Sequence, residues 1–282
     1  MKTAIALGTF DGLHKGHRAV LGKTQGFYTV AVTFDIPPKA FFGGSRELLM
    51  TPRDKETGLK ALGVSEIFTL DFNRIFDMPA ESFFEMLKEK YNPALFACGF
   101  NYRFGAGAKG DTKLLSELCE KNGIEFVCVE SVGGNEPVSS SMLRGMVANG
   151  DVKGANEQIF GGFGFSSEVL HGDARGKTLG FPTINQQFPD VLVKPKFGVY
   201  KSRVIIDGKE YDSITNIGVR PTYKTDFIGC ETYIKNFSAD IYGKIVTLKF
   251  MKFIREEEKF STAESLINAV KSDIKSVLGV EI

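Results

Sequence analysis

The stretch TAIALGTFDGLHKGH (residues 3–17) runs from a strand pattern through a glycine-rich turn to a helix start. Its first part, residues 3–7, has the near-continuous apolar character of a buried strand in a parallel sheet. The glycines that follow allow unusual backbone angles and let a ligand approach the main chain. The helix is expected to begin near Gly16, and the free N–H groups of a helix N-terminus suit phosphate. The stretch therefore favours a phosphate-binding turn.

The turn also holds His14 and His17, two of the three histidines of the chain. They are three residues apart, so both imidazoles can project toward one pocket and donate hydrogen bonds to phosphate oxygens. A structural turn with surface histidines is the alternative. A zinc site is disfavoured because the glutamate of an HExxH motif and a third ligand at a suitable spacing are both missing.

The rest of the first half alternates between two patterns. Strand-like apolar runs alternate with segments of helical periodicity, which predicts a parallel, doubly wound α/β sheet. In such sheets ligands bind beyond the carboxyl ends of the strands, where the opening turn lies. The expected strands are 27–34, 66–70, 94–98 and 124–129, and the expected helices are 17–23, 54–62, 80–91 and 112–122.

The pattern changes near residue 158. The later runs are strand-like, are separated by turn residues, and include an Asp-Gly hairpin signal at 206–210. A closing helix is expected from Thr262 to Leu278, with one apolar face. That face comprises Leu266, Val270, Ile274 and Val277. We therefore expect two domains, a Rossmann-like α/β domain at 1–157 and a small antiparallel β-barrel with a C-terminal helix at 158–282.

Composition and charge exclude several classes of protein. A net charge of +1 gives no basic field for nucleic acid or an anionic membrane. The four cysteines form no CxxC pair, and a disulfide framework is not expected in so long a chain. No signal peptide or apolar run of membrane-spanning length is seen. We expect a cytoplasmic protein that binds neither nucleic acid nor membrane, and weak oligomerisation stays open.

Three motifs in the first half together resemble a known family. HKGH resembles the HxGH signature of nucleotidyltransferases, and the full string at 8–17 resembles the adenylyltransferase half of bacterial bifunctional riboflavin kinase/FMN adenylyltransferases. GFNYRFG (99–105) is similar to a loop of that family, with Asn101 where an Asp is common. VSSSMLR (138–144) is similar to its I-S-S-T-x-x-R motif. By itself this last stretch reads as a serine-rich helix start.

The resemblance implies that the phosphate of FMN attacks the α-phosphorus of ATP, giving FAD and pyrophosphate. An anionic nucleophile needs no protein base, so positioning and charge neutralisation should dominate. The implied catalytic residues are His14, His17 and Arg144. The implied nucleotide-binding residues are Gly8, Thr9, Phe10, Asp11, Gly16, Asn101, Arg103, Ser139, Ser140 and Ser141.

HGDARGKTLGFPTIN (171–185) is a second glycine-rich stretch. On its residues alone it is either an anion-binding barrel loop or an ordinary hairpin, and its glycine spacing excludes a Walker A loop. It resembles the riboflavin kinase signature, with Lys177 and Ile184 as departures. The resemblance implies that Thr183 and Asn185 hold Mg²⁺, which prefers oxygen ligands. The implied ligand-binding residues here are His171, Gly172, Gly176, Lys177, Gly180 and Pro182.

Further matches follow in the family's order: 196–200, 216–222, 231–234 and 253–260. They imply that Asn216 and Arg220 bind substrate and that Glu231 is the catalytic base, with Tyr233 at a position where the family has His. A base is chemically sensible because a hydroxyl is a poor nucleophile until its proton is removed. By itself, a Glu in a strand is an ordinary solvated residue.

The resemblance, from about residue 7 to residue 278, predicts a bifunctional enzyme that makes FMN from riboflavin and FAD from FMN. Its substrates would be ATP, riboflavin and FMN, with Mg²⁺ as cofactor. One alternative is an active adenylyltransferase half with a degenerate kinase domain, and another is a non-catalytic regulator that binds flavin or nucleotide. A third is a nucleotidyltransferase that acts on another small phosphate ester.

Overall fold

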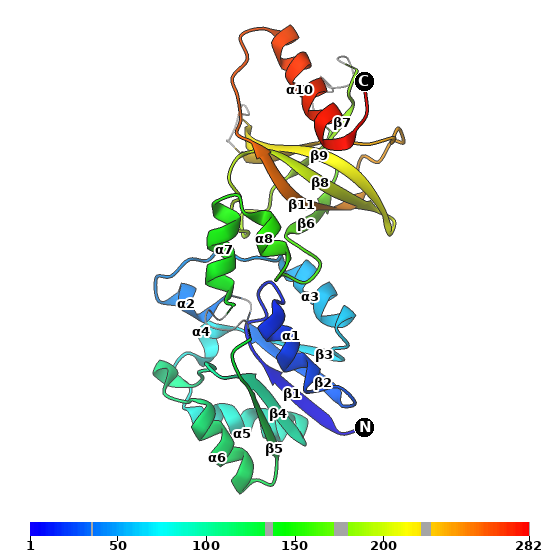
Figure 1. The fold of residues 1–282 in the computed structure, drawn as a ribbon. Helices are drawn as coiled ribbons and strands as arrows, with labels where there is room; N and C mark the ends of the chain where they lie inside the picture. Colours follow the sequence, from blue (N-terminus) through cyan, green and yellow to red (C-terminus); the bar gives the residue numbers. More distant parts are fainter. Residues whose placement is uncertain (35, 133–137, 172–179, 221–226, 282) are drawn as a thin grey trace. The chain divides into compact units, whose positions relative to one another are not determined.

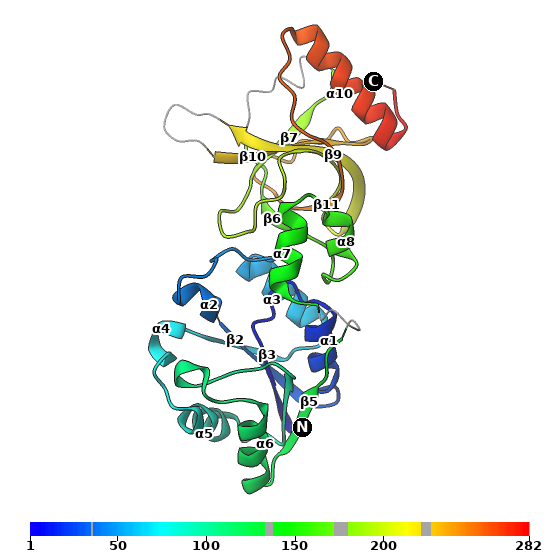
Figure 2. The same ribbon diagram turned by 60° about the vertical axis from the view of Figure 1, so that its left-hand side comes forward.

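The computed structural model describes residues 1–34, 36–132, 138–171, 180–220 and 227–281. The chain divides into two compact units. The first comprises residues 1–48, 52–142 and 158–160, and the second comprises 49–51, 143–157 and 161–282. The predicted boundary at 157/158 stays a prediction. Figure 1 labels most elements of both units, and Figure 2 also labels β10.

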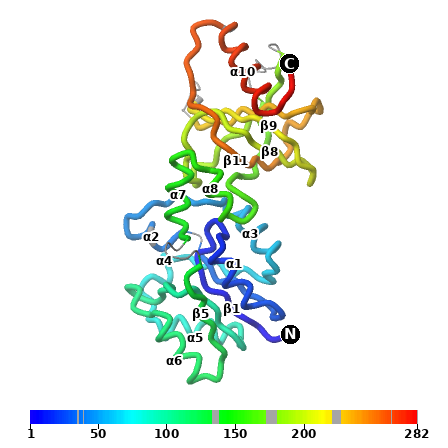
Figure 3. The backbone as a smooth tube through the Cα atoms, in the orientation of Figure 1, coloured from blue at the N-terminus to red at the C-terminus, as the bar shows by residue number. Residues whose placement is uncertain are grey.

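The first unit is built on a five-stranded parallel sheet of order β3-β2-β1-β4-β5. The strands are β1 (Thr3–Leu7), β2 (Tyr28–Phe34), β3 (Glu66–Leu70), β4 (Leu95–Gly99) and β5 (Glu125–Val129). This confirms the predicted Rossmann-like α/β fold. The strand order reverses at β1, so the crevice for ligands lies beyond the carboxyl end of β1. Figure 3 shows the chain leaving that end of β1 and entering the first helix.

Helices cover both faces of this sheet (Figures 1 and 2). The predicted helices are present as α1 (Lys15–Gly22), α3 (Pro52–Ala61), α5 (Ala80–Tyr91) and α6 (Thr112–Lys121). A core of leucine, valine and phenylalanine side chains joins α5 and α6 to one face of the strands. Three short helices were not predicted, namely α2 (Pro38–Phe41), α4 (Phe72–Ile75) and the 3₁₀ turn η1 (Ala106–Ala108).

Two helices precede the second sheet. α7 (Ser140–Ala148) begins in the first unit and continues in the second, while α8 (Val152–Asn156) belongs to the second. The side chain of Asn156 fastens α8 to the second sheet, because its amide donates to the Phe250 carbonyl at 2.7 Å and its Oδ1 accepts from the Phe163 amide at 2.7 Å. α8 was not predicted.

The second unit contains a six-stranded antiparallel sheet of order β6-β11-β8-β9-β10-β7. Its edge strands approach each other, since Gln186 of β7 donates to the Ser167 carbonyl of β6 at 3.1 Å. This closure confirms the predicted small barrel. Asp207 and Gly208, both with positive φ, make the predicted hairpin turn. The strands are β6 (Gly164–Glu168), β7 (Thr183–Gln187), β8 (Gly198–Ile206), β9 (Lys209–Arg220), β10 (Phe227–Ile234) and β11 (Ile245–Arg255).

α10 (Ala263–Leu278) closes the second unit, and its N-cap Thr262 forms a capping box with Ser265. The helix packs on the outer face of the sheet through Ile274 and Leu278, together with Val270 and Val277. One part of the predicted apolar face is wrong. Leu266 is 37% exposed, and Ile267 packs into this cluster instead.

Candidate functional sites

The opening loop, between β1 and α1, has an uncommon backbone. Phe10, Gly12 and Leu13 have φ of +52°, +81° and +43°. Positive φ is unfavourable for residues with a side chain, and such strain gathers at ligand sites. Phe10 and Leu13 are fully buried, so packing holds the loop in this shape.

The loop ends in a stacked pair of histidines. The rings of His14 and His17 lie 3.8 Å apart with an interplanar angle of 23°, and Phe10 packs beside His17 at 5.3 Å between ring centroids. The Nδ1 atoms of both imidazoles are buried without a hydrogen-bond partner. Because a buried donor without an acceptor is costly, we infer that Nδ1 is unprotonated and that Nε2 carries the proton. Each ring thus offers one N–H to a ligand.

Both imidazoles are held in the neutral form. Burial lowers the pKa of His14 from 6.5 to about 4, and the charge of Arg18 lowers it further. Burial also holds the pKa of His17 well below its usual value, and His14 and Lys55 add to this effect. A neutral pair can donate hydrogen bonds near neutral pH without changing its charge.

The same pair predicts a pH dependence of stability. In the unfolded chain His14 takes up a proton as the pH falls through 6.5, whereas in the folded chain His14 stays neutral down to about pH 4. The free energy of unfolding is therefore highest above pH 6.5 and falls as the pH is lowered toward 4. The loss is about 3 kcal/mol, at about 1.4 kcal/mol per pKa unit. Replacing His14 with Gln should make the fall in melting temperature between pH 6.5 and 4 smaller, with the remaining fall due to His17. If the melting temperatures of the unsubstituted chain and of His14→Gln fell in parallel with pH, the lowered pKa of His14 would be contradicted.

The start of α1 suits an anion. His14 is its N-cap residue but makes no side-chain capping bond, and the first turn contains no acidic residue. Neither the N-cap residue nor the first turn thus supplies an acidic or capping side chain that would compete with a ligand. Gly16 lets the loop close tightly, since a Cβ there would lie 3.2 Å from the His14 ring.

The structure brings a second predicted motif to this loop. Ser140, the first residue of α7, donates through its hydroxyl to the Asp11 carbonyl at 2.9 Å, across 129 positions of sequence. Ser139 lies next to it and accepts from the Met142 amide at 3.2 Å. Ser141 is exposed, and the half-buried Arg144 lies one turn beyond Ser140 on the same helix. Two of the three predicted segments of this half are thus joined.

The third segment, 99–105, follows β4 at the same edge of the sheet. Asn101 is exposed, and Arg103 lies 3.5 Å from the carboxylate of Asp111. Gly105 is required here, because its φ is +72° and a Cβ would lie 2.6 Å from the backbone of Ala80. Among the described residues, the ion pair of Arg103 is with Asp111 and not with the opening loop.

A cluster of exposed phenylalanines near this edge was missed by the sequence analysis. Phe41 contacts Phe42, Phe72 and Phe76 at ring distances of 5.3–5.4 Å, and Phe34 contacts Phe72 at 5.8 Å. Phe41, Phe42 and Phe76 are 42%, 69% and 42% exposed. They lie on or beside α2 and α4, which follow β2 and β3 and lie close together in Figures 1 and 2. This phenylalanine cluster is suited to a flat aromatic ligand.

The second candidate site lies on the outer face of the barrel sheet. Glu231 of β10 stands directly opposite Asn185 of β7 and Asn216 of β9, so the three side chains share a face in one cross-strand row. Glu231 is exposed, while Asn216 donates to Glu257 at 3.3 Å and keeps a buried Oδ1 without a partner. Three predicted residues from three separate motifs therefore meet. The row results from the pairing register of the three strands, which could not be predicted from the sequence.

The neighbouring row pairs Thr183 of β7 with Tyr233 of β10. Thr183 and Asn185 are two residues apart on one strand, so their oxygen atoms face the same side and suit a hard cation such as Mg²⁺. Tyr233 packs into the cluster beneath α10. His171 is exposed and stacks on Tyr242 at 4.0 Å.

Other predicted residues of this half are only partly described. Gly180 has a φ of +89°, and Pro182 is exposed. The backbone of Arg220 pairs with Phe227. Gly172, Gly176 and Lys177 lie outside the described residues.

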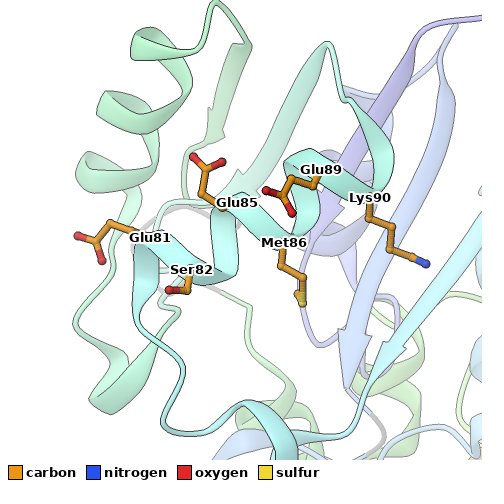
Figure 4. Close-up of a pocket in the computed structure, with 6 residues that line it drawn as sticks. All are labelled: Glu81, Ser82, Glu85, Met86, Glu89 and Lys90. Carbon is orange, nitrogen blue, oxygen red and sulfur yellow. The ribbon is translucent and has the colours of Figure 1, made fainter.

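A shallow pocket elsewhere contains none of the predicted residues. It lies on α5, has a volume of about 630 Å³ and is lined by Glu81, Ser82, Glu85, Met86, Glu89 and Lys90 (Figure 4). All six come from one helix, and Figure 4 shows their side chains spread along its surface. It is an acidic helix face with no convergent groups, so it supports no catalytic site.

Family models match the two halves separately. The model described as FAD synthetase matches residues 1–142, and the model described as riboflavin kinase matches residues 162–280. A bifunctional riboflavin kinase/FMN adenylyltransferase of Bacillus subtilis (strain 168) is 30% identical over 286 residues, covering 96% of this chain and 90% of that protein. The protein of the same name from Escherichia coli (strain K12) is 30% identical over 281 residues, covering 95% and 90%.

A solved structure described as a macrolide-efflux protein from Streptococcus pneumoniae is also similar. It has a TM-score of 0.87 and 28% identity, and the match covers 99% of this chain and 95% of that chain. Within the residues described for the present chain, no helix is long and apolar enough to cross a membrane.

Proposed function

Because the chain belongs to the family of bifunctional riboflavin kinase/FMN adenylyltransferases, we propose that it converts riboflavin to FMN and then FMN to FAD, with ATP as the donor in both steps. The second unit carries the kinase domain and the first carries the FAD synthetase domain. The observation that carries this proposal furthest is the row Asn185–Glu231–Asn216, because a carboxylate flanked by amides suits proton removal from a bound hydroxyl.

In the kinase reaction, the Glu231 carboxylate would take the proton from the 5′-hydroxyl of riboflavin. The hydroxyl oxygen then bonds to the γ-phosphorus of ATP, and the bond from that phosphorus to the bridging oxygen of ADP breaks. Thr183 and Asn185 would hold Mg²⁺, which neutralises charge on the ATP phosphates. The amide of Asn216, held by Glu257, would help to orient the substrate beside the carboxylate.

In the adenylyl transfer, an FMN phosphate oxygen would attack the α-phosphorus of ATP, and pyrophosphate would leave. The Nε2–H groups of His14 and His17 and the N-terminus of α1 would bind the phosphates as negative charge builds on the leaving group. Ser140 supports the loop by its bond to the Asp11 carbonyl. The phenylalanine cluster would stack against the flavin ring. We also propose that the enzyme acts in the cytoplasm.

The decisive assay incubates the purified chain with riboflavin, ATP and Mg²⁺ and separates riboflavin, FMN and FAD. We expect FMN to appear first and FAD to follow. Removal of Mg²⁺ by EDTA should abolish FMN formation. A lack of FMN from riboflavin would exclude the kinase assignment, and a lack of FAD from supplied FMN would exclude the transferase assignment.

The alternative function is that of an active adenylyltransferase whose kinase domain is degenerate. Ile184 and Tyr233 are the departures that favour it, and Lys177 is a third. Tyr233 packs beneath α10, one row away from Glu231, so its substitution for His leaves the Asn185–Glu231–Asn216 row intact. The same assay separates the two readings, because a degenerate kinase domain makes FAD from FMN but no FMN from riboflavin.

A further inference from the structure

Lys55 of α3 reaches out of its helix to the carboxyl end of β2. Its Nζ donates to the Phe34 carbonyl at 3.0 Å and to Thr33 Oγ1 at 3.3 Å. Thr33 is completely buried, and its hydroxyl donates in turn to the Thr9 carbonyl at 2.9 Å. A chain of hydrogen bonds therefore runs from a lysine ammonium to the backbone of the opening loop.

The charge of Lys55 also acts on the histidine pair, because it helps to lower the pKa of His17. The groups that act on the pair are Lys55 and His14 at His17, and Arg18 at His14. The imidazoles themselves are neutral, so they add no net charge for a phosphate. A lysine fixed by two oxygen atoms loses little further side-chain freedom when an anion binds.

We propose that Lys55 is a positioning residue of the adenylyl-transfer site, which anchors the Thr9 carbonyl through Thr33 and supplies a fixed positive charge at the opening loop for the phosphates of the nucleotide. This inference rests on the proposed function of the first unit. It gives the site a permanent cation from α3, a helix that contributes no residue to the predicted motifs.

The test uses the full chain and inorganic pyrophosphate as the probe, followed on the imidazole NMR signal of His17. The chain has three histidines, so substitution identifies each signal. Lys55→Met should weaken pyrophosphate binding about ten- to hundredfold, the loss expected for a charged hydrogen-bonding group. It should also raise the pKa of His17, because a nearby positive charge is removed. Lys55→Arg should restore most of the binding.

Lys60→Met is the matched control. Lys60 lies on the same helix, is 63% exposed and pairs with Glu56 at 2.6 Å, so its loss should leave pyrophosphate binding unchanged. Lys55→Gln keeps an N–H donor for the Phe34 carbonyl and removes the charge. If Lys55→Met does not fold, pyrophosphate binding is therefore measured on Lys55→Gln instead.

Unchanged pyrophosphate binding in a folded Lys55→Met or Lys55→Gln chain would overturn the proposal, even if the melting temperature fell. So would the absence of any pyrophosphate effect on the His17 signal of the unsubstituted chain. Failure of the proposed function is seen separately. A chain that forms no FAD from FMN refutes that function, while the pyrophosphate titration still reports on Lys55.

Discussion

Replacing Glu231 with Gln should reduce FMN formation from riboflavin by roughly 10²–10⁴-fold, the usual contribution of a general base. The amide matches the carboxylate in size, so its place in the row between Asn185 and Asn216 should survive. What disappears is the ability to take the proton of the riboflavin hydroxyl. The measurement is kcat for FMN formation, with kcat for FAD formation from supplied FMN determined on the same preparation.

The matched control is Glu168→Gln, which changes an exposed glutamate on β6 of the same sheet. It should leave both rates unchanged. The conversion of FMN to FAD should also be unaffected in Glu231→Gln, because the carboxylate belongs to the other domain. A rate of FMN formation near that of the unsubstituted chain would remove Glu231 from the role of base.

The part of the fold predicted from the sequence is the part encoded locally. The run from β1 through the glycine turn to α1 carries its own strand pattern, turn residues and helix start. The Asp207-Gly208 turn and the Thr262 N-cap are similarly local, because each depends on backbone preferences of a few consecutive residues. Periodicity could not decide between Leu266 and Ile267, which are adjacent and equally apolar.

What the sequence did not predict depends on tertiary contacts. α2 and α4 are each four residues long, too short to show a helical period. The phenylalanine cluster that they carry was hidden among the 25 phenylalanines of the chain. Lys55 meets Thr33 across 22 positions, and only the packing of α3 reveals this contact. The resemblance to family motifs predicted Glu231, Asn185 and Asn216 as site residues. That they lie side by side follows only from the register of the strands.

Replacing His17 with Ala should have the opposite effect on the two activities. FAD formation from FMN should fall by roughly 10²–10³-fold, as for the loss of one donor to a developing negative charge. FMN formation from riboflavin should persist, because His17 belongs to the first unit. The measurement is kcat/KM for FMN in the presence of ATP, followed by the release of pyrophosphate. Loss of both activities in a folded chain would refute this division of labour.

Two further variants test which nitrogen of His17 acts. The amide N–H groups of a Gln side chain come near the position of Nε2, whereas those of Asn come near Nδ1. His17 Nδ1 is buried without a partner, so the proton that serves the phosphate should be on Nε2. His17→Gln should therefore regain part of the lost rate, and His17→Asn should behave like His17→Ala. If Asn rescues the rate and Gln does not, the imidazole acts through Nδ1, and the opening loop must rearrange to expose that atom when the nucleotide binds.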